Sequence, residues 1–124
     1  MVKVLIIDDV RYMCDVIGNV CKKNNLETLI AESGDEGLKI LIEHPDVKLI
    51  FLDLVMPKMN GIEFLNAIGK VDKLTQIPIV VTTANVSEKI VNALKNYKIS
   101  AFLAKPVRVP KILELLVQHD LLSS

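Results

Sequence analysis

Short apolar runs alternate along this chain with longer stretches in which apolar residues recur every three or four positions. The runs are rich in Val, Ile and Leu, which is typical of parallel strands buried on both faces of a sheet. They predict strands at residues 3–7, 27–31, 49–52, 79–82 and 101–104. The periodic stretches predict helices at about residues 11–25, 62–68, 87–98 and 110–119, and one between Ser33 and Pro45. This alternation predicts an α/β fold, a five-stranded parallel sheet with helices on both faces.

Local signals mark several element boundaries. Ser33 stands three residues before Glu36, which is the spacing of a capping box at a helix start. After the third strand, Pro57, Asn60 and Gly61 predict a loop instead of an immediate helix. Because this loop follows the end of a strand, we expect it to overhang the carboxyl edge of the sheet.

Four of the predicted strands are followed by reactive polar residues. Asp8 and Asp9 follow the first strand, Asp53 the third, Thr83 the fourth and Lys105 the fifth. In open α/β sheets, ligands bind just outside the carboxyl ends of the strands. If these strands are neighbours, one pocket holds three carboxylates, a hydroxyl and an ammonium.

Such a pocket has definite chemistry. Two carboxylates about 4 Å apart repel by roughly 4 kcal/mol at an effective dielectric of about 20, so three of them need a counter-charge. Magnesium suits the site because it takes oxygen ligands and commonly bridges carboxylates to a phosphate. A carboxylate can act as a nucleophile toward phosphorus, and an ammonium binds phosphate as a point charge. The pattern therefore predicts phosphoryl transfer to Asp53.

Simpler interpretations of these residues stay open at this point. Asp8 or Asp9 could serve only as the cap of the first helix, and Asp53 could be a turn residue. Thr82 competes with Thr83 for the place of the hydroxyl, although the expected strand register favours Thr83.

Composition and charge restrict the partners. The chain has 124 residues, with 15 Lys and Arg against 15 Asp and Glu, so its formal net charge is zero. This length predicts one domain, and the charge balance gives no sign of nucleic acid or an anionic membrane as partner. The amino-terminal apolar run is too brief for a secretory signal, and no stretch reaches the ~18 apolar residues of a membrane span. We therefore expect a cytoplasmic protein.

The chain contains two cysteines, Cys14 and Cys21. On a helix, their separation corresponds to a rise of about 10.5 Å, which is too far for a disulfide. We expect both to be reduced thiols that pack as small apolar residues.

The motifs IIDD, FLDLVMPKMNG, VVTTAN and AFLAKP, in this order, resemble the receiver domain of bacterial response regulators. The resemblance covers residues 1–124, and it implies a flavodoxin-like doubly wound (βα)5 fold without an output domain. It also implies that Asp53 accepts a phosphoryl group from the phosphohistidine of a sensor histidine kinase or a histidine phosphotransfer protein. Such a domain catalyses only its own phosphorylation and dephosphorylation.

The resemblance assigns roles to individual residues. Asp9, Asp53 and the backbone carbonyl of Val55 would ligate Mg²⁺, for which Mn²⁺ can substitute. Asp8 would hold the metal through water. Lys105 would contact the phosphoryl oxygens.

The resemblance also implies a switch. Thr83 would contact the phosphoryl group, and Phe102 would change rotamer with it, although Phe102 can also be plain core. The surface of the fourth helix, fifth strand and fifth helix would then bind a downstream protein. We expect a monomer, or a weak homodimer that depends on phosphorylation. Val55 and Asn85 stand where the family tunes hydrolysis of the phosphoryl group; Val55 cannot orient a water, whereas Asn85 can.

Three rival functions fit the sequence less well. A haloacid-dehalogenase-like phosphoaspartyl hydrolase needs a second acid two residues after its nucleophile, where this chain has the apolar Val55. A flavin or nucleotide binder of flavodoxin type needs a Gly-rich or hydroxyl-rich loop after the first strand, and DDVRYM offers none. A degenerate receiver, acting as a phosphorylation-independent interaction module, is disfavoured by the intact polar set.

Overall fold

The computed structural model describes residues 1–55, 59–84 and 86–123. Within these residues the strands are β1 (Lys3–Ile7), β2 (Glu27–Ala31), β3 (Leu49–Asp53), β4 (Ile79–Thr83) and β5 (Ile99–Ala104). The α-helices are α1 (Arg11–Lys23), α2 (Gly34–Glu43), α3 (Gly61–Ile68), α4 (Glu88–Ala93) and α5 (Val109–Gln118). A 3₁₀ helix, η1 (Asp72–Leu74), precedes β4.

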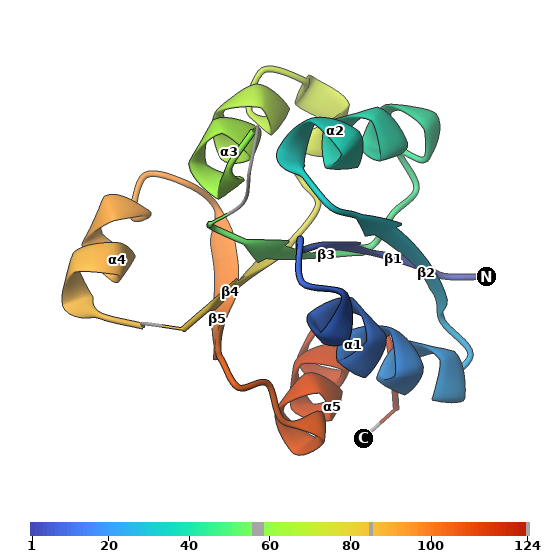
Figure 1. Cartoon of the computed structure of the whole chain (residues 1–124). Coiled ribbons are helices and arrows are strands. Elements are labelled where there is room, and N and C mark those ends of the chain that lie inside the picture. Colours follow the sequence, from blue (N-terminus) through green and yellow to red (C-terminus); the bar gives the residue numbers. More distant parts are fainter. Residues whose placement is uncertain (56–58, 85, 124) are drawn as a thin grey trace.

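The strands form one parallel sheet in the order β2-β1-β3-β4-β5. Helices α1 and α5 lie on one face, and α2 and α3 lie on the other (Figure 1). Helix α4 is placed beside β4 and β5 (Figure 1). This arrangement confirms the predicted doubly wound α/β fold. Among the described residues, no helix combines the length and the apolar character that crossing a bilayer requires.

Two apolar layers hold the sheet between the helices. Along β1, Val4 and Ile6 pack with α1 and α5, whereas Leu5 and Ile7 pack with α2 and α3. All four side chains are fully buried. Because both faces of the strand need apolar residues, the sequence shows a continuous run where a half-exposed strand would alternate. The same burial on both faces explains why β3 and β4 were recognisable.

The helix starts follow the sequence signals only in part. As predicted, Ser33 is the N-cap of α2, and its side chain accepts a hydrogen bond from the Glu36 N–H at 3.4 Å. The Glu36 carboxylate, however, accepts from the Glu32 N–H, so the predicted capping box is not reciprocal. The N-cap of α1 is Val10, without a side-chain cap. The interpretation of Asp8 or Asp9 as the helix cap was therefore wrong, because the chain needs three residues to turn from β1 into α1.

The segment after β4 departs most from the prediction. A helix was expected over residues 87–98, but α4 ends at Ala93 and β5 begins at Ile99, two residues earlier than predicted. Ile99 is aligned with Ile79, and a register irregularity follows. Strand β5 therefore also includes Ile99 and Ser100, which the sequence prediction places between the helix and the strand. Residues 94–98 connect the end of α4 to the start of β5. Asn85 and Pro57 lie outside the described residues.

Both cysteines are buried free thiols, as predicted. The Cys14 Sγ lies 3.4 Å from the Asp8 carbonyl oxygen, and Cys21 packs in the layer beneath α1 and α5. Burial raises the pKa of each thiol to about 11, and the negative charge of Asp8 adds to the effect at Cys14. At neutral pH both groups are therefore protonated.

This burial predicts slow chemistry at the thiols. A thiol reagent such as a disulfide chromogen, added at pH 8, is expected to leave native protein unmodified because the nucleophile is the thiolate. Denaturant should expose both groups and give complete reaction. Rapid labelling of either cysteine in the folded protein would contradict the placement of α1 against the sheet.

Candidate functional site

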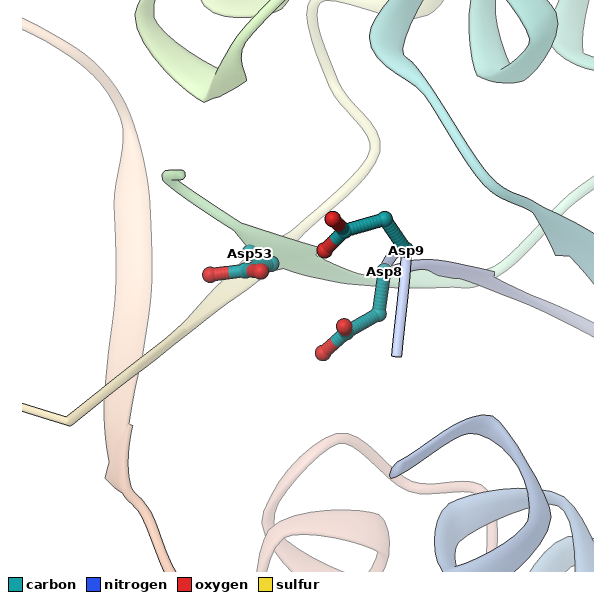
Figure 2. A group of neighbouring side chains, drawn as sticks. All are labelled: Asp8, Asp9 and Asp53. Atoms are coloured by element: carbon teal, nitrogen blue, oxygen red, sulfur yellow. The ribbon is translucent and has the colours of Figure 1, made fainter. Parts of the chain in front are cut away.

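Three carboxylates meet at the carboxyl edge of the sheet (Figure 2). Asp53 is the last residue of β3, while Asp8 and Asp9 directly follow β1, the neighbouring strand. One carboxylate oxygen from each of the three lies within 4.8 Å of the others. Asp8 and Asp53 are buried, and Asp9 is exposed. The predicted convergence of these acids is confirmed, and the cluster is reached from solvent on the side of Asp9.

Lys105 supplies the positive charge of the site. Its Nζ lies 3.2 Å from Asp8 Oδ2 and 3.5 Å from Asp53 Oδ2. Because β5 is separated from β3 by β4, the long lysine side chain is what allows the contact. The backbone at this point is also fixed, since the Lys105 N–H donates to the Thr83 carbonyl at 2.8 Å. The structure thus brings together the ammonium and the acids that the sequence analysis had grouped.

Backbone N–H groups orient the two buried carboxylates. Asp8 Oδ1 accepts from the Val10 N–H at 2.8 Å, and Asp53 Oδ1 accepts from the Val55 N–H at 3.3 Å. In each case the remaining oxygen, Oδ2, faces Lys105. Backbone N–H groups therefore fix one oxygen of each buried acid, and the Lys105 ammonium lies beside the other oxygen.

The site carries more negative than positive charge. Three carboxylates stand against one ammonium, and the pKa of Asp53 is raised above its ordinary value. Burial is the main cause and the charge of Asp8 adds to it, while Lys105 and the Val55 N–H act in the opposite direction. A cluster of hard oxygen donors with excess negative charge fits a divalent cation such as Mg²⁺.

The other predicted residues lie around this cluster. Thr83 ends β4 and is aligned with Ala104, whereas Thr82 is aligned with Asp53 and is 1% exposed. Thr83 therefore lies one residue nearer to the open edge than its competitor Thr82. The Val55 side chain is 81% exposed and directed away from the core. Its apolar side chain is therefore exposed to solvent next to the acids.

Phe102 lies in β5, aligned with Val81 of β4. It is half-buried and packs against the apolar layer beneath α2 and α3. This position combines a core contact with partial access to solvent, as its role in a switch requires, and the role itself stays a prediction.

One contact near the site was not predicted. The Gly34 N–H donates to the Met59 carbonyl at 2.9 Å and so joins the start of α2 to the loop that follows Asp53. The only local signal was a glycine directly after the capping Ser33. Such a signal is too common to identify a tertiary contact.

Comparison with known proteins identifies the family. The family model of the response regulator receiver domain matches residues 4–117. This chain belongs to the response regulator receiver family. Two-component response regulator ORR11 of rice (Oryza sativa subsp. indica) is 33% identical over 106 residues, which are 85% of this chain and 71% of the rice protein. Chemotaxis protein CheY of Listeria monocytogenes is 31% identical over 118 residues, covering 94% of this chain and 96% of that protein.

Solved structures agree with this assignment. Chemotaxis response regulator CheY4 of Vibrio cholerae has a TM-score of 0.88 and 25% identity, covering 96% of this chain and 98% of its own. A two-component response regulator from Legionella pneumophila has a TM-score of 0.84 and 29% identity, covering 98% of this chain and 100% of its own. The chain is thus a receiver domain of response-regulator type with a CheY-like flavodoxin fold.

The raised pKa of Asp53 predicts that the receiver's stability changes with pH. A native pKa above the unfolded value means that the folded state binds this proton more tightly. The contribution is present below the ordinary carboxyl pKa and is lost as pH rises through the native pKa. Asp53→Asn should therefore increase the free energy of unfolding by about 1 kcal/mol at pH 7 without metal, and by much less near pH 3.5.

Chemical denaturation of both proteins across this pH range measures the difference. Asp9→Asn is the matched control, because its exposed charge is screened by solvent and should give a smaller gain. A variant Asp53→Asn that is equally or less stable than the native protein at pH 7 would contradict the electrostatic account.

Proposed function

We propose that this receiver accepts a phosphoryl group on Asp53 from the phosphohistidine of a sensor histidine kinase or histidine phosphotransfer protein. One observation carries the proposal. A buried carboxylate at the end of a central strand lies 3.5 Å from a lysine ammonium and beside two further acids. This arrangement unites a nucleophile, a binder for phosphate and oxygen donors for a cation.

The acids fit Mg²⁺, or Mn²⁺ in its place. Asp9, Asp53 and the Val55 carbonyl would hold the ion directly, and Asp8 would hold it through water. When bound, the cation neutralises the carboxylates and draws phosphoryl oxygens toward Asp53. Its charge would also favour the ionised form of Asp53 and so oppose the effect that raises the pKa of this carboxylate.

The proposed reaction transfers one phosphoryl group from the histidine of the partner to Asp53. The Asp53 Oδ2 attacks phosphorus, a P–O bond forms, and the P–N bond to the histidine breaks. The histidine leaves as a neutral imidazole after taking a proton from solvent. Lys105 then exchanges its contact with the free carboxylate for one with a phosphoryl oxygen, and the Thr83 hydroxyl donates to another.

The signal is proposed to leave the site through β4 and β5. Contacts of Thr83 and Lys105 with the phosphoryl group exist only in one conformation, so they shift an equilibrium between two states. Moving that equilibrium from about 1:99 to 99:1 requires roughly 5.5 kcal/mol, which a few charge-assisted hydrogen bonds can supply. Phe102 turns inward as Thr83 moves.

The surface proposed to respond is formed by α4, β5 and α5. A groove there is lined by Val86, Phe102 and Pro106, with Arg108 and Lys111 beside them. Helix α4 has no buried residue among those described and packs against the core through the half-buried Ile90, so a shift of this helix disturbs few core contacts. The groove is a candidate site for the downstream protein. We also propose that the domain works in the cytoplasm as a monomer or a weak phosphorylation-dependent homodimer, and without nucleic acid.

Phosphorylation is the direct test of this function. Purified protein incubated with acetyl phosphate and Mg²⁺ should gain the mass of one phosphoryl group, measured on the intact chain. Asp53→Asn and removal of the metal by a chelator should each abolish the gain, because the first removes the nucleophile and the second the counter-charge. An unchanged mass in the native protein would refute the proposal.

The proposed switch predicts separate effects on chemistry and on signalling. Phe102→Ala should leave the rate of phosphorylation within about twofold, because Phe102 is not among the charged groups at the acids. It should suppress the amide chemical-shift changes that phosphorylation causes in α4 and the start of α5. Val109→Ala, at an exposed position of α5, is the control and should keep those changes. Equal responses in the Phe102 variant and the native protein would remove Phe102 from the switch.

A further inference from the structure

The connection between β2 and α2 lies between the two segments that carry the acids. On one side, the Asp8 N–H donates to the Ala31 carbonyl at 3.0 Å. On the other side, the Gly34 N–H donates to the Met59 carbonyl at 2.9 Å. Residues 31–34 therefore join the end of β1 to the loop that follows Asp53, through backbone hydrogen bonds on both sides.

The contact with the loop is possible only without a side chain at position 34. A Cβ atom there would lie 2.7 Å from the Met59 carbonyl oxygen and 2.7 Å from Met59 Cγ. Carbon atoms do not approach an oxygen or a methylene so closely, and one of the two overlaps is with backbone. None of the described glycines has a positive φ, so Gly34 is required for space and not for its backbone angle.

The loop is also closed at its base. The Gly61 N–H donates to the Leu54 carbonyl at 3.1 Å, and a Cβ at position 61 would lie 2.7 Å from the Asp53 carbonyl oxygen. Met59 stands two residues before this closure. A displacement of Met59 therefore acts, over a short and hydrogen-bonded stretch, on the backbone of Asp53 and Leu54.

We propose that Gly34 is a positioning residue of the phosphoacceptor site: its bare Cα lets α2 hold the Met59 carbonyl, and this contact, through the hydrogen bond of Gly61 with Leu54, fixes the backbone that presents the Asp53 carboxylate. The inference rests on the proposed function and deepens it. Gly34 is joined to Met59 by its N–H, and it acts through that residue. A side chain at position 34 would displace Met59 and, through Gly61, the backbone of Asp53 and Leu54.

Three glycine-to-alanine variants separate this role from general stability. Gly34→Ala disturbs the loop contact. Gly37→Ala is the matched control on the same helix, because its Cβ would lie 2.6 Å from Ile7 Cδ1, the flexible end of a core side chain, and not near the loop. Gly18→Ala in α1 meets nothing within 4 Å, and alanine is the better helix former.

The measurements are a Mg²⁺ titration of the unphosphorylated protein, followed by amide chemical shifts, and a thermal melt of each variant. Gly34→Ala should weaken Mg²⁺ binding by about tenfold, as loss of a group that orients metal ligands commonly does. Gly37→Ala should lower the melting midpoint but keep the Mg²⁺ affinity within about twofold of the native value. Gly18→Ala should raise the midpoint by a few degrees and leave binding unchanged.

A double variant identifies the contact that matters. Gly34→Ala with Met59→Ala removes the overlap with Met59 Cγ but keeps the overlap with the backbone carbonyl. Binding should therefore stay weak, whereas full recovery would assign the effect to side-chain packing and overturn the proposal. Equal losses of affinity in Gly34→Ala and Gly37→Ala would also overturn it.

The native protein provides a test that needs no substitution. Because coupling between two events is reciprocal, Mg²⁺ should slow hydrogen exchange of the Gly34 N–H, which lies at the start of α2 and donates to Met59. The Gly37 N–H, which donates to the Ser33 carbonyl at 3.0 Å, should change less. Unaltered exchange at Gly34 refutes the proposal. A native protein that binds no Mg²⁺ refutes the proposed function itself, whereas normal Mg²⁺ binding with an indifferent Gly34 refutes only this inference.

Discussion

The structure depends on one electrostatic constraint, the confinement of like charges at the edge of an apolar sheet. Burial of the strands on both faces fixes where β1 and β3 end, and so it fixes Asp8 and Asp53 beside each other. The apolar layers carry the energy of folding and leave the acids no freedom to separate. One ammonium, from Lys105, compensates only part of the charge. The fold therefore maintains a cluster whose excess negative charge a bound cation would offset.

This constraint divides the work among the surrounding groups. The Val10 and Val55 N–H groups fix one oxygen of each buried acid and leave the other toward Lys105. Asp9 is exposed and free of this restriction, which suits a ligand that completes a coordination shell. The two buried acids are thus held in fixed positions, whereas Asp9 lies at the solvent-exposed side of the cluster. Residues 31–34, which connect β2 to α2, add a further restraint, because they bind the backbone of Asp8 and of Met59.

The sequence was sufficient where one force dominates. The uninterrupted apolar run of β1 predicted its observed bounds, because burial on both faces decides that strand. The bounds of β2 were also predicted, although this edge strand is mostly half-buried and Ile30 is exposed. The acids and Lys105 followed from the rule that strand ends share an edge. Prediction from the sequence failed where local and tertiary preferences compete. Asp8 binds Lys105 and the Val10 N–H instead of capping α1. Likewise, the helix predicted over residues 87–98 ends at Ala93, and β5 begins at Ile99.

Other features have no local signal at all. The cis peptide bond between Lys105 and Pro106 cannot be read from a Lys-Pro step. The need for a glycine at position 34 depends on the position of Met59, which is distant in sequence. The preference for Thr83 over Thr82, which the expected register predicts, agrees with the pairing that aligns Thr82 with Asp53. Such details arise from how the segments meet, and the pattern of each segment does not contain them.

The central claim, that the three acids form one cation site, is tested most directly by calorimetric titration of the protein with Mg²⁺ at pH 7. The account predicts saturable binding of one ion per chain, and a large loss of affinity in both Asp9→Asn and Asp53→Asn. Binding that is absent from the native protein, or that persists unchanged in both variants, would contradict it.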